Sequence, residues 1–201
     1  MTESQLRRHG LESFLASVPN DAGSNPGVTI EVLPPLGHLN LRGDPKNEGF
    51  LTAAADVLGE TLPLAANTMS HGVRRIYWLG PDEWLIVTVV EETVGLLVQF
   101  RSSLSGQHAS VTDVSGGQVA LRLAGPYARN VLAKGCTLDF HRDRFETGDC
   151  AQTGLAKATV LIGLLDSEPT YEIIVRRTFA DYLARWLRRA SREYSVNFSA
   201  A

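Results

Sequence analysis

Residues 39–45 read Leu-Asn-Leu-Arg-Gly-Asp-Pro and residues 121–126 read Leu-Arg-Leu-Ala-Gly-Pro, so one short pattern occurs twice in the chain. In each copy, alternating leucines typical of a strand run into a glycine that is followed within two residues by proline. Proline suits the first position of a helix, where its missing N–H needs no partner. Each copy therefore predicts a strand leading into a helix, and the first helix is expected to begin at Pro45 with Asp44 as its cap.

The elements expected around the two copies follow the same order in both halves of the chain. In the first half they are strands at 28–33, 37–42, 74–79, 83–90 and 108–114, with helices at 45–58 and 92–104. In the second half they are strands at 119–123, within 148–165 and at 170–175, with helices at 126–134 and 179–192. This order is the split β-α-β arrangement. We predict an α+β fold of two tandem ferredoxin-like (βαββαβ) units with antiparallel sheets.

The same reading sets the expected boundaries. Loop-forming residues 19–27 close an N-terminal arm, 1–27, in which Leu11, Phe14 and Leu15 could form a helical turn that docks on a partner or on the body of this protein. The first unit is expected at 28–115, the second at 116–195 and a tail at 196–201, with the two units packing as one domain.

Composition restricts the class of protein. The 201 residues are 44% hydrophobic and 20% charged, which is typical of a globular chain, and the formal net charge of −3 gives no attraction to nucleic acid. The first residues lack the apolar segment of a secretory signal, and no apolar run is long enough for a membrane span. With only Cys136 and Cys150, both expected as free thiols, we predict a cytoplasmic protein.

The sequence contains no complete catalytic or cofactor motif. No Gly-x-Gly-x-x-Gly run lies between a strand and a helix, and Gly116-Gly117 is interpreted as a turn. The five histidines (His9, His38, His71, His108, His141) form no metal-ligand pair; Cys136, His141 and Cys150 would make at best a weak metal site or Cys–His pair. We therefore assign no catalytic, cofactor-binding or metal-binding residue.

Two further features carry opposing interpretations. Lys134-Gly135-Cys136 resembles a folate-site signature, but it falls at a helix end. There the charge of Lys interacts favourably with the helix dipole and Gly supplies a left-handed turn, so we interpret the run as structural.

Arg185, Arg188 and Arg189 lie on the outer face of the last helix and could form a partner interface. The alternative is a solvated face with an Asp181–Arg185 pair, and both interpretations stay open.

Several longer runs together resemble one protein family. They are 79–85 (LGPDEWL), 111–117 (VTDVSGG), 121–126 (LRLAGP), 131–136 (VLAKGC), 148–153 (GDCAQT) and 171–180 (YEIIVRRTFA). On these runs the chain resembles the gamma subunit of heterotetrameric sarcosine oxidase, within the aminomethyltransferase-like, folate-binding superfamily.

The resemblance implies a set of expectations. The complex would demethylate sarcosine oxidatively to glycine, form hydrogen peroxide and pass the one-carbon unit to tetrahydrofolate as methylenetetrahydrofolate. FAD, FMN, NAD and zinc would lie in the alpha, beta and delta subunits, with alpha the direct contact, while this chain would hold no cofactor and no catalytic residue. The alternatives are a stand-alone folate-binding or aminomethyltransferase-like protein, the equivalent subunit of a dimethylglycine demethylase, or a generic interaction module using the arginine face.

Overall fold

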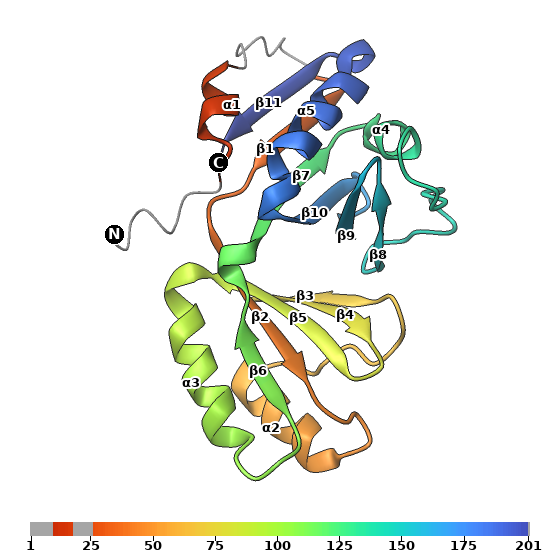
Figure 1. The fold of residues 1–201 in the computed structure, drawn as a ribbon. Coiled ribbons are helices and arrows are strands. Elements are labelled where there is room, and N and C mark those ends of the chain that lie inside the picture. The colour runs from red at the N-terminus through yellow and green to blue at the C-terminus, as the bar shows by residue number, and fades with distance from the viewer. Residues whose placement is uncertain (1–9, 18–25, 201) are drawn as a thin grey trace. The chain divides into compact units, whose positions relative to one another are not determined.

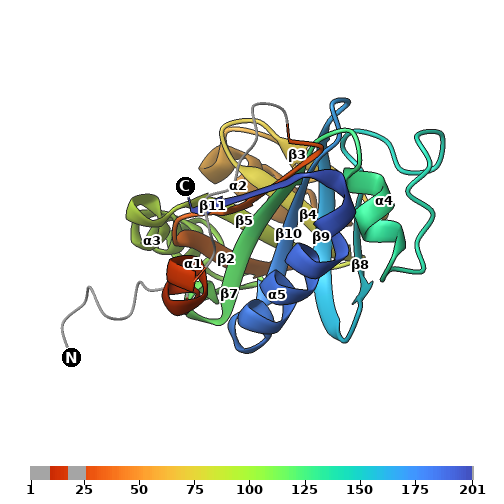
Figure 2. The ribbon, with the colours of Figure 1, turned by 90° about the horizontal axis from the view of Figure 1, so that it is seen from above.

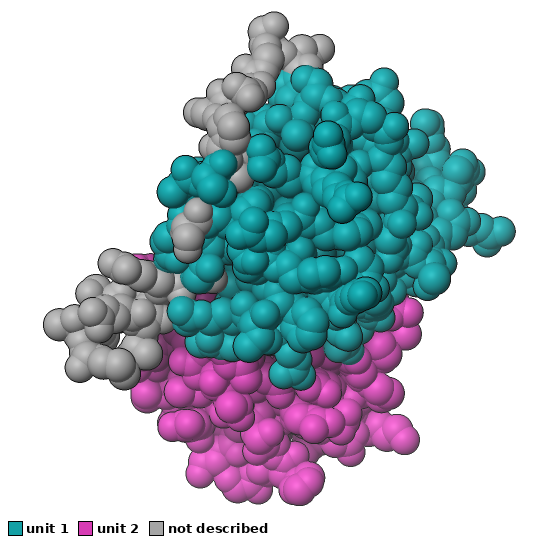
Figure 3. All heavy atoms as spheres, turned by 45° about the horizontal axis from the view of Figure 1, so that its top comes forward, with its two compact units in different colours: residues 1–35, 116–201 teal, residues 36–115 magenta. Residues whose placement is uncertain are grey.

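The computed structural model describes residues 10–17 and 26–200 (Figure 1). It divides into two compact units: unit 1 takes residues 1–35 and 116–201, and unit 2 takes residues 36–115 (Figure 3). Each unit pairs one sheet with its own helices.

Unit 2 is a ferredoxin-like unit with one extra strand. Its elements are β2 (Leu36–Arg42), α2 (Glu48–Leu58), β3 (Met69–His71), β4 (Arg75–Gly80), β5 (Glu83–Val89), the 3₁₀ turn η2 (Val90–Glu92), α3 (Thr93–Ser103) and β6 (Ser110–Asp113). The sheet runs β3-β4-β5-β2-β6, and every strand pair is antiparallel. Without β3 this is the order expected of a βαββαβ unit, so the predicted fold of this repeat is confirmed.

The core of unit 2 lies between this sheet and helices α2 and α3. Leu39, Leu41 and Ile86 project from alternate positions of the strands, and Phe50 and Phe100 project from the two helices. Trp84 is fully buried among them, and its Nε1–H donates to the carbonyl of Pro63 at 2.8 Å. The alternation of leucines that predicted the strand is thus the alternation that fills this core.

Helix α2 begins later than the sequence indicated. Its cap is Asn47, whose side chain accepts a hydrogen bond from the N–H of Phe50 at 3.2 Å. Asp44 instead accepts from the N–H of Lys46, which makes a turn ahead of the helix. The expected cap at Asp44 is therefore wrong, because a short polar side chain closes a turn as readily as it caps a helix. The helix ends as expected at Gly59, which is left-handed with φ 74°.

Unit 1 is a second ferredoxin-like unit with two additions. The described elements are α1 (Glu12–Ser17), β1 (Val28–Val32), the turn η3 (Ser115–Gly117) that leads into the unit, β7 (Gln118–Ala124), α4 (Ala128–Ala133), β8 (Cys150–Leu155), β9 (Ala158–Asp166), β10 (Thr170–Arg176), η4 (Arg177–Phe179), α5 (Ala180–Ala190), η5 (Arg192–Tyr194) and β11 (Val196–Ala200). The sheet runs β11-β1-β7-β10-β9-β8. β1 is antiparallel to β7 and parallel to β11. Apart from β1 and the edge strand β8, the order again matches a βαββαβ unit, so the α+β fold is confirmed in both repeats.

Two expected boundaries need correction. Residues 28–35 were assigned to the first repeat, yet β1 lies in the sheet of unit 1, where Ile30 and Val32 are buried in its core. Residues 196–201 were expected as a tail, yet β11 forms the fourth strand of the second repeat and buries Phe198. Both assignments depend on strand partners that are far apart in sequence, and local sequence patterns carry no information about such pairing.

Two helices of unit 1 need a closer description. α5 buries Leu183, Ala184 and Leu187 along one face, as an amphipathic helix does. α1 packs beside α5 and β11, with Leu11 and Phe14 buried in the core of the same unit (Figure 2). Of the two docking modes left open for this segment, the structure shows docking on the chain's own body. Residues 1–9 and 18–25 of the expected arm lie outside the described part.

No helix within the described residues is long and apolar enough to cross a membrane.

Candidate functional site

The arginines singled out on the last helix line a hollow on the surface of unit 1. The hollow, called the arginine hollow below, has a volume of about 600 Å³. It is lined by Phe14, Arg185, Arg188, Arg189, Arg192 and Val196. Three separate elements, α1, α5 with η5, and β11, therefore build one concave surface that the sequence had indicated only through α5.

Helical geometry and core packing account for the shape of the hollow. Arg185, Arg188, Arg189 and Arg192 follow one another at i, i+3, i+4 and i+7, so they share one side of α5 and its continuation. The guanidinium of Arg185 lies 5.1 Å from the ring centroid of Phe14, a cation–π contact. Phe14 is itself held edge-on against Phe198, with ring centroids 5.1 Å apart. The apolar wall of the hollow is thus anchored in the core.

The carboxylates of Asp181 on α5 and Glu193 on η5 are already engaged. Asp181 accepts a hydrogen bond from Arg185 Nε at 2.8 Å, and this contact raises the pKa of Arg185. Glu193 pairs with Lys134, whose ammonium group also donates to the carbonyl of Ala190. The expected Asp181–Arg185 pair is therefore present. Within residues 10–17 and 26–200, Arg188, Arg189 and Arg192 form no ion pair, which leaves the hollow strongly cationic.

The structure does not gather Cys136, His141 and Cys150 into a site. Both cysteines are buried and neither is in a disulfide, and Cys136 Sγ lies 3.5 Å from the hydroxyl of Thr153. His141 is exposed in the segment between α4 and β8, where its Nδ1 accepts from the N–H of Asp143. Across the described part of the chain, no three His, Cys, Asp or Glu side chains are grouped as metal ligands would be.

Lys134-Gly135-Cys136 follows α4 and takes a structural role, but not for the reason expected. Gly135 is outside the left-handed region, so a left-handed turn is not what requires glycine. A Cβ at this position would lie 2.4 Å from the ring of Trp186 on α5. Gly135 is therefore needed for the close approach of α4 to α5, and Lys134 adds a cation–π contact to Tyr194 at 4.4 Å.

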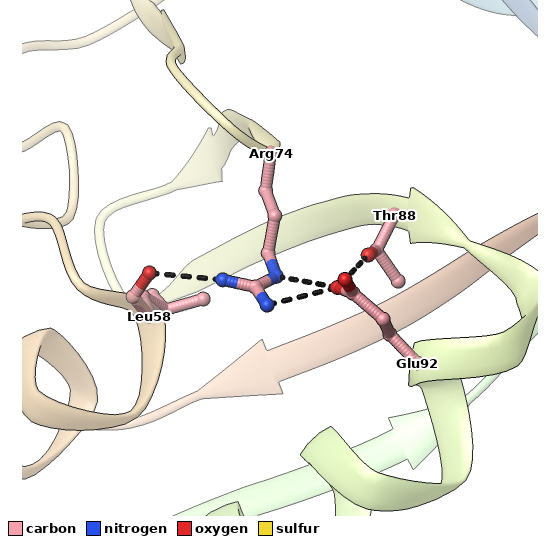
Figure 4. A network of polar contacts seen from close by, with 4 residues as sticks. All are labelled: Leu58, Arg74, Thr88 and Glu92. Carbon is pink, nitrogen blue, oxygen red and sulfur yellow. Dashed lines mark hydrogen bonds and ion pairs between the residues drawn. The ribbon is translucent and has the colours of Figure 1, made fainter.

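A polar network in unit 2 is structural as well. Arg74 donates through Nε and Nη2 to one carboxylate oxygen of Glu92 at 3.2 and 2.8 Å, and through Nη1 to the carbonyl of Leu58 at 3.0 Å (Figure 4). Thr88 donates to the same oxygen at 2.8 Å. The hydrogen bond from Thr88, followed by Arg74, lowers the pKa of Glu92. Arg74 thereby satisfies a carbonyl at the end of α2 and links it to the start of α3.

His38 on β2 is a buried titratable group that the spacing of metal-ligand and catalytic motifs does not single out. Its side chain is 1% exposed, and burial is the main cause that lowers its pKa to about 4. The contact of Nδ1 with the carbonyl of Leu36 at 3.2 Å opposes this shift, as does the charge of Asp113, whereas Arg75 adds to it. A period-2 strand pattern places His38 on the face opposite Leu39, which was the one available signal.

Comparison with known proteins identifies the family. The sequence model described as the sarcosine oxidase, gamma subunit family matches residues 42–193. The sarcosine oxidase subunit gamma of Corynebacterium sp. (strain U-96) is 31% identical over 196 residues, which are 96% of this chain and 94% of that protein.

Solved structures agree. A chain of the heterotetrameric sarcosine oxidase from Corynebacterium sp. U-96 in complex with pyrrole 2-carboxylate matches with a TM-score of 0.85 at 30% identity, over 95% of this chain and 97% of that one. The glycine cleavage system aminomethyltransferase T from Bartonella henselae matches with a TM-score of 0.64 at 16% identity, over 96% of this chain and 50% of that one, which shows a shared fold. With a family match over most of its length and a relative above 30% identity, the chain belongs to the sarcosine oxidase gamma subunit family.

Proposed function

We propose that the chain is the gamma subunit of a heterotetrameric sarcosine oxidase. The observation that carries the proposal is the match to a chain of the Corynebacterium complex over 95% of this chain and 97% of that one. A match of that extent, in which neither chain has a large unmatched segment, supports an equivalent place in an equivalent assembly.

In this role the chain supplies structure to the complex rather than reacting groups. The complex oxidises sarcosine to glycine with oxygen as the acceptor, releases hydrogen peroxide and passes the methylene unit to tetrahydrofolate. FAD, FMN, NAD and zinc belong to the partner subunits, and the alpha subunit is the direct contact of this chain. A cytoplasmic setting is part of the proposal, and it is supported by Cys136 and Cys150, which are buried and not joined in a disulfide.

Co-expression tests the proposal. Expressed with the alpha, beta and delta subunits of its own complex, the chain should co-purify with them at a fixed stoichiometry. Expressed alone, it should fold and be colourless. Absence of stable association with the other subunits would refute the proposal, and so would sarcosine turnover by the isolated chain.

Two further measurements separate the alternatives. Calorimetric titration of the isolated chain with tetrahydrofolate should give no binding heat; tight binding would favour the stand-alone folate-binding protein. Assay of the assembled complex on sarcosine and on dimethylglycine should show preference for sarcosine. Preference for dimethylglycine would identify the equivalent subunit of a related demethylase instead.

A further inference from the structure

We infer that the arginine hollow is the docking site for an acidic segment of another subunit of the complex, one that places two carboxylates beside an apolar side chain. This inference rests on the proposed function, and it names the surface and the chemistry of the contact. The arginines suggested a partner interface from sequence; the described structure adds the hollow, its apolar wall and its uncompensated charge.

The charge of the hollow is the first argument. Asp181 pairs with Arg185, and Glu193 pairs with Lys134, so the acids of α5 and η5 do not neutralise the other arginines of the hollow. Arg188, Arg189 and Arg192 lack a carboxylate partner within residues 10–17 and 26–200. The guanidinium group of Arg is planar and can donate two parallel hydrogen bonds to one carboxylate. Each acidic side chain of a docked segment would therefore satisfy several donors.

The length of the cationic row is the second argument. From Arg185 to Arg192 the helix and its continuation rise by about 10 Å, at roughly 1.5 Å per residue. Side chains two residues apart on an extended segment are separated by about 7 Å. The row therefore accommodates two carboxylates of one extended segment, whereas a single small anion would occupy only part of it.

The apolar wall is the third argument. Phe14 and Val196 line the hollow beside the arginines, and Phe14 is fixed by its contacts with Phe198 and Arg185. Apolar surface beside Arg is typical of the centre of protein interfaces, where Arg and aromatic residues dominate the binding energy. A partner side chain seated against this wall would exclude water from the neighbouring ion pairs and strengthen them.

Charge reversal provides the first test. The full chain is titrated into an assembly of the other subunits that was expressed without it. R188E/R189E should weaken the association by about 100-fold, roughly tenfold for each arginine at a binding hot spot. R142E/R144E, which makes the same charge change in an exposed segment, should stay within about twofold of wild type. R188K/R189K should fall between them, because Lys keeps the charge and loses the fork.

Each outcome of the titration decides something. Wild-type strength in R188E/R189E, or equal weakening in R142E/R144E, overturns the inference while the proposed function stands. Failure of the wild-type chain to associate overturns both. If circular dichroism shows that R188E/R189E is unfolded, R188Q/R189Q replaces it, since Gln removes the charge without creating an acidic helix end.

Crosslinking identifies the occupant. In the complex carrying R188K/R189K, a zero-length carbodiimide joins a lysine amine to a carboxylate in contact with it. Crosslinks from residues 188 and 189 to Asp or Glu of another subunit are expected. Crosslinks confined to Glu3 or Asp21 of this same chain would overturn the inference, because its own N-terminal segment would then fill the hollow. Absence of any crosslink at these positions would count against it as well.

Discussion

Replacing His38 by Leu should make the protein less sensitive to acid. The imidazole is buried on β2, and within the described residues its Nε2 has no hydrogen-bond partner. Leu therefore removes an ionisable group together with the contact of Nδ1 to the carbonyl of Leu36. At pH 8, where the imidazole is neutral in the folded and unfolded protein, loss of that contact should lower the free energy of unfolding by about 1 kcal/mol.

The size of the effect follows from the difference in pKa between the two states. The pKa of His38 is about 4 in the folded protein and 6.5 in the absence of its surroundings. As the pH falls below 6.5, the unfolded chain takes up a proton that the folded protein does not, so stability decreases until the pH reaches the folded value. At pH 5 the decrease spans about 1.5 pH units, and at roughly 1.36 kcal/mol per unit it amounts to about 2 kcal/mol.

Urea unfolding at pH 8 and pH 5 measures this difference. Between pH 8 and pH 5, the free energy of unfolding should fall by about 2 kcal/mol more in wild type than in His38→Leu. His108→Leu is the matched control, because it makes the same substitution at a histidine whose side chain is exposed. Equal acid sensitivity of wild type and His38→Leu would refute the reasoning, since it would mean that His38 binds its proton in the folded protein as easily as in the unfolded one.

Three other predictions concern packing and hydrogen bonding. Gly135→Ala should lower the free energy of unfolding, measured in urea, by about 1–3 kcal/mol, because its methyl group would lie 2.4 Å from the indole ring of Trp186. Gly154→Ala is the control, since the space around Gly154 is open and the added methyl group meets no clash. Trp84→Phe should lower the free energy of unfolding by about 2–4 kcal/mol in the same measurement, since it leaves a cavity and removes the donor to the half-buried carbonyl of Pro63; a loss below 1 kcal/mol would contradict this. Arg74→Met should speed hydrogen exchange at the end of α2 through loss of the network in Figure 4, and unchanged exchange would show that the network does not hold the helix end.

Local sequence signals predicted most of the elements because each signal acts within a few residues. Alternating leucines predicted β2 and β7, and Gly59 predicted the end of α2. The start of α2 was wrong because Asp44 and Asn47 are equally capable of closing a turn or capping a helix. The role of Gly135 was wrong because the atom that excludes a side chain there belongs to a different helix.

The residues of the candidate site were also predictable from the sequence only in part. Helical periodicity alone places Arg185, Arg188 and Arg189 on one face, so those residues could be named from the sequence. Periodicity does not reveal that Phe14 and Val196 complete a hollow around them, because α1 and β11 come from opposite ends of the chain. The i, i+4 spacing did indicate the Asp181–Arg185 pair, but it does not reveal that Glu193 is paired with Lys134.

The sequence by itself determined the two β-α-β repeats, the polar and apolar faces of the helices, and the family through its longer runs. Only the tertiary structure decided that β1 and β11 complete the second sheet, that the short N-terminal helix docks beside α5, and that His38 is buried. The physical reason is that backbone periodicity and turn chemistry are properties of neighbouring residues, whereas strand partners, burial and the balance of charge on a surface depend on residues that only the folded chain brings together.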